Sequence, residues 1–220
     1  MRTSQPMASS WHIKRFGIVL AGAAFFLTEY HLVAMMTAGR HVQLMSELDR
    51  AIPLIPWTAW LYAPLYAAGI IATGFMLRDE RLFLRAIVAV GIGQTINSVF
   101  YVALPSAYPR AEAFTGVPTE GVSMAILRWV HSIDPPHNTF PSAHVMVAFL
   151  CAMLAWRSGH RGRWFPVLTG LGIAIAVTTT KQHYIVDSLA GIAVAWTALR
   201  AADWWMDRRG GRLERTERSA

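Results

Sequence analysis

Residues 164–180, WFPVLTGLGIAIAVTTT, and residues 184–205, YIVDSLAGIAVAWTALRAADWW, are long apolar runs separated by only three residues. A helix that crosses a bilayer needs about 20 mostly apolar residues, because hydrocarbon offers no partner for an exposed backbone N–H or C=O group. The two runs therefore predict two membrane-spanning helices joined by a tight polar turn, Lys181-Gln182-His183.

Four more apolar runs precede these two, at residues 17–37, 56–77, 82–104 and 141–157. The sequence thus predicts an all-α integral membrane protein, a bundle of six transmembrane helices. Short interfacial helices are expected on the outer face. One is expected at residues 41–51, where apolar residues recur at helical spacing, and another at about residues 122–130.

The composition agrees with this fold class. Of the 220 residues, 54% are hydrophobic and 15% are charged, whereas soluble domains have about a quarter charged residues. The formal net charge of +7 does not indicate a nucleic-acid partner, because the basic residues flank the apolar runs, as topology determinants do. The single cysteine, Cys151, excludes an intrachain disulfide and a cluster of thiolate ligands.

The distribution of basic residues predicts the orientation in the membrane. If the N-terminus is inside, 15 Lys and Arg residues lie on the inner side of the predicted spans and 5 on the outer side. Cytoplasmic loops carry such an excess of positive charge. We therefore expect a multi-pass protein of the cell membrane with both termini in the cytoplasm.

The fourth span opens with the sequence NTFPSAH, residues 138–144. Pro141 is typical of a first helical position, and Asn138 or Thr139 is expected to cap the helix. A helix N-terminus offers free backbone N–H groups to an anion, and Ser142 adds a hydroxyl donor. His144 then lies in the first turn of this predicted anion site.

The sixth span opens with His183 and Asp187, which are four residues apart and so share one face of a helix. An Asp that accepts from one ring nitrogen leaves the other free as a nucleophile, and Lys181 adds positive charge. His144 and His183 are 39 residues apart, enough for one helix across the membrane and one back. Both histidines and Arg110 are therefore expected at the outer face, around a phosphate ester.

The Pro-Ser-Ala-His motif at residues 141–144 and the His-Tyr-Ile-Val-Asp motif at 183–187 resemble the type-2 phosphatidic acid phosphatase superfamily. The longer strings, together with IPLIPW at residues 52–57 and Leu104-Pro105, are similar to its inositolphosphorylceramide-synthase-like branch. The resemblance departs from the superfamily pattern in its first motif, where Ala103 stands at the lysine position and Ala111 follows Arg110. Ala176 and Val177 occupy the places of its usual Ser-Arg pair.

The resemblance implies a mechanism. His183 attacks phosphorus to form a phosphohistidine, Asp187 orients His183, and His144 protonates the departing oxygen and then deprotonates the acceptor. Arg110, Lys181 and Ser142 hold the phosphoryl oxygens. Neither a metal nor another cofactor is expected, because protein cations take the metal's place.

The implied function is that of a membrane lipid phosphatase acting on a lipid phosphate or pyrophosphate. A phosphotransferase that moves a phospho-headgroup between lipids remains an alternative. Another class, a haem- or quinone-binding or non-catalytic lipid-binding membrane protein, leaves Asp187 and the cations unexplained. The expected partners are the bilayer and a lipid phosphate, and the sequence predicts no oligomeric state.

The predicted organisation is one domain with two short flanking segments. Residues 1–16 are expected to form a cytoplasmic N-terminal segment, residues 17–206 the six-span catalytic membrane domain, and residues 207–220 a basic cytoplasmic tail, polar enough for disorder. Asp134 is interpreted as a capping or turn residue beside Pro135 and Pro136. Glu29 and Gln94, inside predicted spans, are interpreted as residues that join helices or, for Glu29, line a substrate path.

Overall fold

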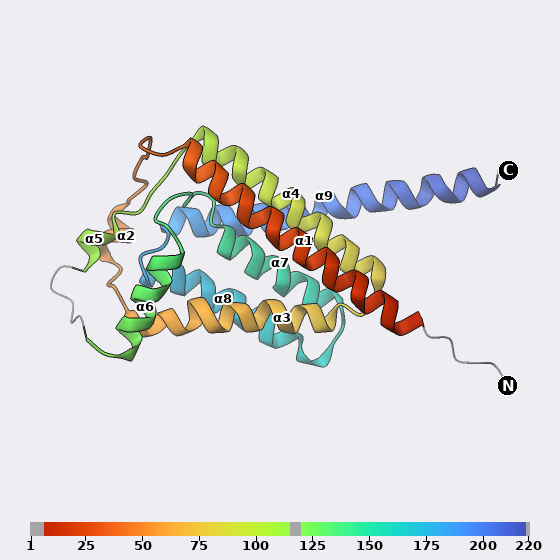
Figure 1. Cartoon of the computed structure of the whole chain (residues 1–220), viewed down its shortest axis with the longest axis horizontal. Helices are drawn as coiled ribbons and strands as arrows, with labels where there is room; N and C mark the ends of the chain where they lie inside the picture. The colour runs from red at the N-terminus through yellow and green to blue at the C-terminus, as the bar shows by residue number, and fades with distance from the viewer. Residues whose placement is uncertain (1–6, 115–119, 219–220) are drawn as a thin grey trace.

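The computed structural model describes residues 7–114 and 120–218, and the regular structure within these ranges is helical. The elements are α1 (Met7–Met36), α2 (Glu47–Ala51), η1 (Pro56–Thr58), η2 (Leu61–Leu65), α3 (Tyr66–Met76), α4 (Glu80–Ala103), α5 (Arg110–Ala113), α6 (Val122–Ile133), α7 (Ala143–Arg157), η3 (Arg161–Arg163), α8 (Trp164–Thr179) and α9 (Ile185–Arg218). The start of α1 and the end of α9 lie toward the same end of the long axis (Figure 1).

Four of these helices are long and apolar enough to cross a membrane, namely Ile13–Met36, Pro56–Met76, Glu80–Ala103 and Ile185–Arg209. They correspond to the first, second, third and sixth predicted spans. The helices at the fourth and fifth predicted spans, α7 and α8, are shorter, with 15 and 16 residues. The apolar helices identify a helical membrane protein.

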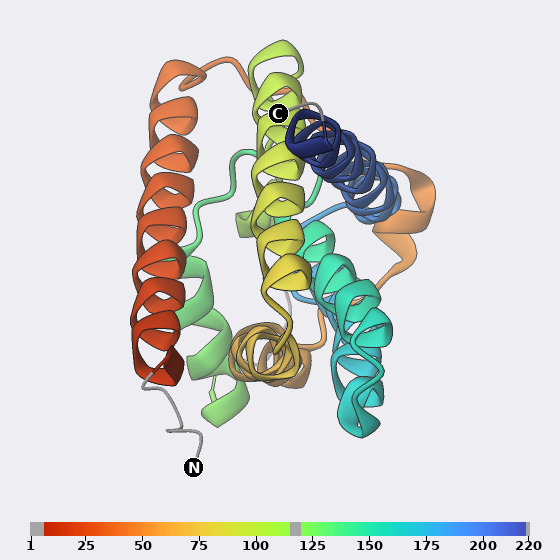
Figure 2. The ribbon, with the colours of Figure 1, turned by 90° about the vertical axis from the view of Figure 1, so that its right-hand side faces the viewer.

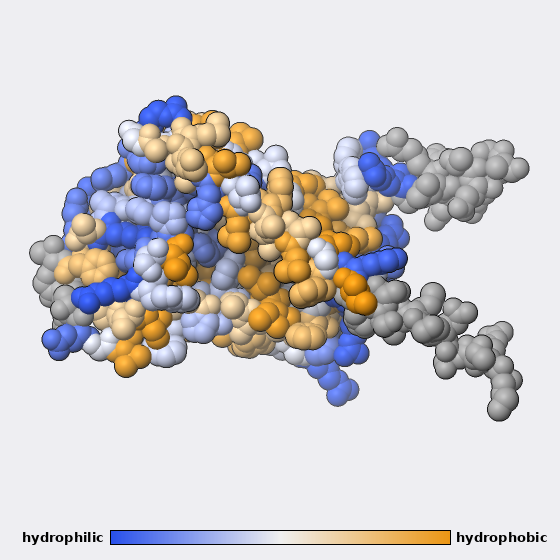
Figure 3. All heavy atoms as spheres, viewed as in Figure 1, coloured by the Kyte–Doolittle hydropathy of each residue, from blue (hydrophilic) through white to orange (hydrophobic). Residues whose placement is uncertain are grey.

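The outer surface of the bundle carries large apolar side chains instead of the polar side chains that cover a soluble protein. Phe75, Phe25 and Trp196 are 78%, 66% and 61% exposed. Hydrophobic residues gather over the middle of the visible face, and hydrophilic residues lie toward both ends (Figure 3). This arrangement fits helices whose flanks face hydrocarbon and whose ends face water.

The core lies around α7, which packs against α4, α8 and α9. One cluster of buried residues includes Ala89 of α4, Met146 of α7 and Leu199 of α9. A second cluster joins α7 to α8 and includes Tyr62 and Val145. A backbone hydrogen bond from Ser142 to Asp187 places the start of α7 beside the start of α9, which is where the two histidine motifs lie.

Helix α1 lies along α4 (Figures 1 and 2) and has few buried residues of its own. Gln94 of α4 donates a side-chain hydrogen bond to Glu29 of α1. This pair joins two helices, as expected of polar groups inside spans.

The structure corrects two local expectations and agrees with a third on the position of a helix. Residues 41–51 form a helix only at α2, because the Ser46 and Asp49 capping box starts the helix at Glu47, while Val42 pairs its backbone with the strand-like segment at Pro105 and Ala107. α6 forms where the second interfacial helix was expected. The prediction of disorder after residue 207 was wrong, since α9 continues to Arg218, a stretch without proline.

Candidate active site

The turn between α8 and α9 presents His183. The backbone N–H groups of Gln182 and His183 both donate to the Val177 carbonyl, at 2.9 and 3.0 Å, which closes the end of α8. The first turn of α9 then begins under a second constraint, because the Tyr184 N–H donates to Asp187 Oδ2 at 2.9 Å. Of the His183 and Asp187 pair, therefore, Asp187 lies within α9, whereas His183 lies just before the helix.

The protonation of the His183 ring follows from its two neighbours. Its Nδ1 atom lies 2.9 Å from the Thr139 carbonyl oxygen and 3.4 Å from Asp187 Oδ2. A carbonyl and a carboxylate oxygen only accept hydrogen bonds, so Nδ1 carries the proton. The lone pair of Nε2 is then free, which is what a nitrogen nucleophile requires.

His144 enters from the first turn of α7, whose N-cap is Ser142. The Ser142 hydroxyl accepts from the Val145 N–H at 3.3 Å, so Ser142 caps this helix in place of Asn138 or Thr139. The Ser142 N–H donates to the Asp187 carbonyl at 3.1 Å, and this bond ties α7 directly to α9.

A glycine permits this close approach of the two helices. A Cβ atom on Gly191 of α9 would lie 2.7 Å from the Ser142 carbonyl oxygen and 3.1 Å from the Val145 Cβ. Backbone-to-backbone contact at this point sets the spacing of the two helix N-termini. As a result, the ring centres of His144 and His183 are 5.8 Å apart, with their planes inclined by 60°. One phosphoryl group can contact both rings.

The three expected phosphate ligands are placed differently from one another. Arg110 is buried and donates to the carbonyls of Asp134 and Pro135, at 2.5 and 3.3 Å, and to the Gln182 side chain. Burial lowers the pKa of Arg110, and the nearby Asp134 charge opposes that shift. The Nε atom of Arg110 has no partner among the described residues.

Lys181 points away from the two imidazoles. Its ammonium donates to the Asp49 and Ile52 carbonyls at 3.1 and 2.5 Å. These bonds hold the turn before His183 against the segment that follows α2. Burial lowers the pKa of Lys181, with Asp49 opposing the shift. Ser142 is fully buried, and its hydroxyl is oriented by the hydrogen bond that it accepts from the Val145 N–H of α7.

Sequence reasoning missed the residues that anchor the catalytic turn from outside. The Asp49 carboxylate accepts from the Ile185 N–H at 2.8 Å and so caps α9 from α2. His131 of α6 donates from Nε2 to the Thr180 carbonyl at 2.9 Å. Burial is the main cause that lowers the pKa of His131, to about 4. No local sequence motif predicts such contacts, because the two partners of each contact are distant in sequence.

Asp134 caps the C-terminus of α6, as expected, and its side chain has further partners that the sequence does not reveal. Its carboxylate accepts from the Tyr62 hydroxyl at 2.5 Å and from the Tyr30 hydroxyl at 3.4 Å, and it lies 4.0 Å from Arg110. Burial alone raises the pKa of Asp134, but His144, the Tyr62 hydrogen bond and Arg110 outweigh it and lower the pKa overall. Asp134 is thus an ionised carboxylate beside the two histidines.

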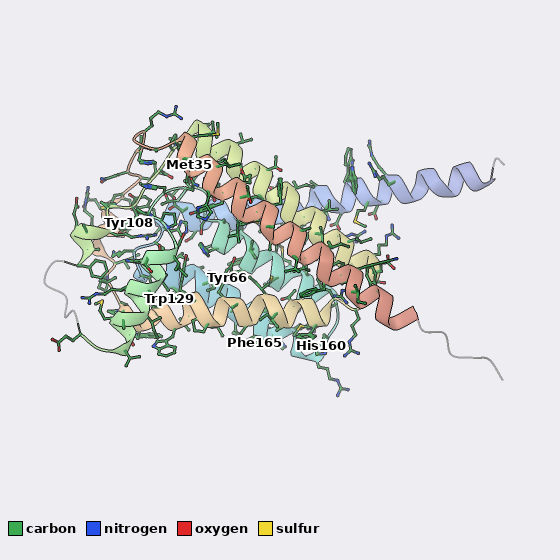
Figure 4. The ribbon with its side chains drawn as sticks, viewed as in Figure 1. Met35, Tyr66, Tyr108, Trp129, His160 and Phe165 are labelled. Atoms are coloured by element: carbon green, nitrogen blue, oxygen red, sulfur yellow. The ribbon has the colours of Figure 1, made fainter. Side chains whose placement is uncertain are left out.

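A mostly apolar cavity of about 360 Å³ opens beside His144. It lies between α1, α3 and α6, the region where Figure 4 labels Tyr66 and Trp129, two of its lining residues. Tyr108, by contrast, lies near α5, and His160 lies at the opposite end of the bundle (Figure 4).

Among the side chains that the structure describes, no group of three or more His, Cys, Asp or Glu residues is arranged to hold a metal ion. The model of one protein family, described as the PAP2 superfamily, matches residues 34–201 of the 220, a range that contains both histidine motifs and Arg110. No curated protein and no solved structure shows significant similarity to the chain.

Proposed function

Because this chain belongs to the PAP2 superfamily, whose members are phosphatases, we propose that it is a membrane lipid phosphatase that hydrolyses a lipid phosphate or pyrophosphate. The observation that carries the proposal is the pairing of two imidazoles 5.8 Å apart, one of which has its Nδ1 held and its Nε2 free. That arrangement suits nucleophilic attack by one ring and proton transfer by the other.

In the first proposed step, His183 Nε2 attacks phosphorus in line with the bond to the lipid oxygen. The N–P bond forms as the P–O bond breaks, and His144 gives its proton to the leaving oxygen. In the second step a water oxygen attacks phosphorus, the N–P bond breaks, and His144 takes the proton from the water. From a lipid phosphate the products are the lipid alcohol and inorganic phosphate, and from a lipid pyrophosphate they are the lipid monophosphate and inorganic phosphate.

Charge stabilisation is the largest demand in phosphoryl transfer. We assign Arg110 and the N-terminus of α7, capped by Ser142, to the phosphoryl oxygens. Lys181 already donates two hydrogen bonds to backbone carbonyls, so we assign it to holding the turn and to supplying one further donor. The Gln182 amide nitrogen, buried and without a partner among the described residues, is an additional candidate donor.

The membrane arrangement completes the proposal. Six spans, with α7 and α8 as the two short ones, return the heads of α7 and α9 to one face. The basic residues favour cytoplasmic termini, which puts the site on the outer side of the cell membrane. Residues 17–206 form the catalytic membrane domain in this arrangement.

The alternatives differ in the acceptor or in the class of protein. A phosphotransferase of the inositolphosphorylceramide-synthase type uses the same histidines but passes a phospho-headgroup from one lipid to the alcohol of another lipid. A haem- or quinone-binding protein uses the two histidines as ligands, and a visible absorption band of the purified protein tests it. A non-catalytic lipid-binding protein releases no phosphate.

The decisive experiment uses purified protein in detergent with a chelator and a panel of lipid phosphates and pyrophosphates. Free phosphate and transfer to added diacylglycerol or ceramide are measured separately. We expect phosphate release to persist in chelator, to vanish in His183→Ala and to drop sharply in Asp187→Ala. His160→Asn, at the far end of the bundle, is the matched control and should retain full turnover. Undiminished turnover in His183→Ala would contradict the proposal.

A further inference from the structure

The carboxylate of Asp134 contacts polar side chains from three other parts of the chain. The Tyr62 hydroxyl of η2 donates to it, and Arg110 of α5 lies 4.0 Å away. The Tyr30 hydroxyl of α1 lies 3.4 Å from the carboxylate and shares its proton with the His137 carbonyl at 3.2 Å. The Asp134 side chain is only 15% exposed. A buried carboxylate needs such partners, but a purely structural role does not explain why one of them also contacts a catalytic histidine.

Tyr62 makes that second contact. Its hydroxyl oxygen lies 2.9 Å from Nε2 and 3.1 Å from Nδ1 of His144, and the two ring centres are 4.8 Å apart. Tyr62 is brought there by η2, a π-helical turn that contains Pro64. Proline has no N–H group, so the regular α-helical ladder cannot form at this turn.

The direction of the hydrogen bonds follows from a count of protons. A phenol has one proton, and a carboxylate only accepts, so the 2.5 Å contact assigns the Tyr62 proton to Asp134. The Tyr62 oxygen then turns its lone pairs toward His144. Lone pairs attract an imidazole N–H, and they attract it most strongly when the ring is a cation.

We propose that Asp134 and Tyr62 are positioning residues for His144, a carboxylate–phenol pair that orients this ring and stabilises its protonated form; the inference rests on the proposed function. The site then contains two separate acid–imidazole pairs. Asp187 acts directly on His183, and Asp134 acts on His144 through Tyr62.

The surroundings of His144 make such a pair necessary. The ring faces His183 at the start of α9, Tyr62 and Tyr66 on the second span, and the charges of Asp134 and Arg110. Asp134 is the only anion among these five groups, while Arg110 is a cation. When His144 holds the proton that it gives to the leaving oxygen, only Asp134 offsets its charge in this group.

Tyr62→Phe tests the inference while keeping the contacts of Asp134 with Tyr30 and Arg110. We expect the first turnover on an alkyl lipid phosphate to slow about 10- to 100-fold, the size expected for loss of one charge-assisted hydrogen bond. KM should change little, and the alkaline limb of the pH–rate profile should move to lower pH. Asp134→Asn should show the same shift, larger in size.

The dependence on the leaving group separates proton transfer from structural support. With p-nitrophenyl phosphate, whose leaving group needs little protonation, the burst of p-nitrophenol in Tyr62→Phe should stay within about threefold of the wild type. Tyr108→Phe is the matched control. It also removes a phenol hydroxyl from a buried ring, but Tyr108 lies near α5 and stacks on Tyr184, with ring centres 4.7 Å apart, instead of contacting His144.

The outcomes separate this inference from the proposed function. If His183→Ala is inactive but Tyr62→Phe behaves like Tyr108→Phe, the positioning role is wrong and the phosphatase stands. Equal loss on both leaving groups with an unmoved pH limb likewise overturns the positioning role, because it reports a structural defect. Activity in His183→Ala contradicts the proposed function itself.

Discussion

Replacing Gly191 by alanine tests whether the contact between α7 and α9 sets the spacing of the two imidazoles. The new Cβ atom would lie 2.7 Å from the Ser142 carbonyl oxygen and 3.3 Å from the Met146 N–H nitrogen, both backbone atoms. The first distance is about 0.8 Å short of the ~3.5 Å at which non-bonded contacts become favourable. Backbone cannot rotate out of the way, so α7 and α9 must move apart by an amount of that order.

The magnitude follows from the displacement. Overpacking of this kind costs about 1–3 kcal/mol, and alanine returns up to about 1 kcal/mol through its better helix propensity. The net loss of stability is thus expected at about 1–2 kcal/mol. A misplacement of about 1 Å between reacting groups costs about 100-fold in rate, so kcat should fall by about 10- to 100-fold, more than the loss of stability suggests.

The assay is phosphate release from a lipid phosphate in detergent, with thermal unfolding of the same samples. Gly91→Ala in α4 is the matched control, because a Cβ atom there meets nothing within 4 Å. This control should be fully active and at least as stable as the wild type. If Gly191→Ala matched Gly91→Ala in both measurements, close backbone packing would not be what holds the two histidines at their separation.

Three further predictions concern side-chain contacts that stabilise the fold. Asp49→Ala should lower stability by about 0.5–2 kcal/mol, since it removes the cap on α9, whereas Glu47→Gln, which changes only an exposed pair with Arg50, should be neutral in thermal unfolding. Burial lowers the pKa of His131 to about 4, below its unfolded value of about 6.5, so the folded state binds fewer protons than the unfolded state between these pH values. The contribution of His131 to stability should therefore be full above about pH 6.5 and should fall as the pH drops toward 4. In a pH series of melting temperatures, His131→Gln should flatten this dependence. Asp203→Asn, which breaks a two-pronged contact with Arg157 at 2.8 and 2.9 Å, should lower the melting temperature more than Asp207→Asn, because the Asp207 side chain is 61% exposed in its pairs with Arg81 and Arg85. Equal effects would contradict this ranking.

The helical positions were largely predictable because a membrane-spanning helix is a local property of an apolar run. The regions from residue 56 to 76, from 80 to 103 and from 185 onward form helices within a few residues of the predicted bounds. Local signals also explain the errors. The Ser46 and Asp49 capping box is a short pattern that outweighed the apolar spacing upstream of it. At the start of α7, Ser142 is the N-cap instead of Asn138 or Thr139.

The sequence by itself determined that His144 and His183 return to one end of the bundle, because that depends only on the number and length of the spans between them. It also determined that Asp187 lies near His183, since only three residues separate them, although His183 itself precedes α9. Such conclusions need one chain direction and one helix geometry, and both are fixed by local chemistry.

Only the tertiary structure decided which side chains act on these histidines. Thr139 holds Nδ1 of His183, Tyr62 joins His144 to Asp134, and Lys181 turns to backbone carbonyls instead of the imidazoles. The partners of Tyr62 are 72 and 82 residues away along the chain. Pairings of that kind depend on how helices pack around Gly191 and η2, because packing brings together residues that no local pattern relates.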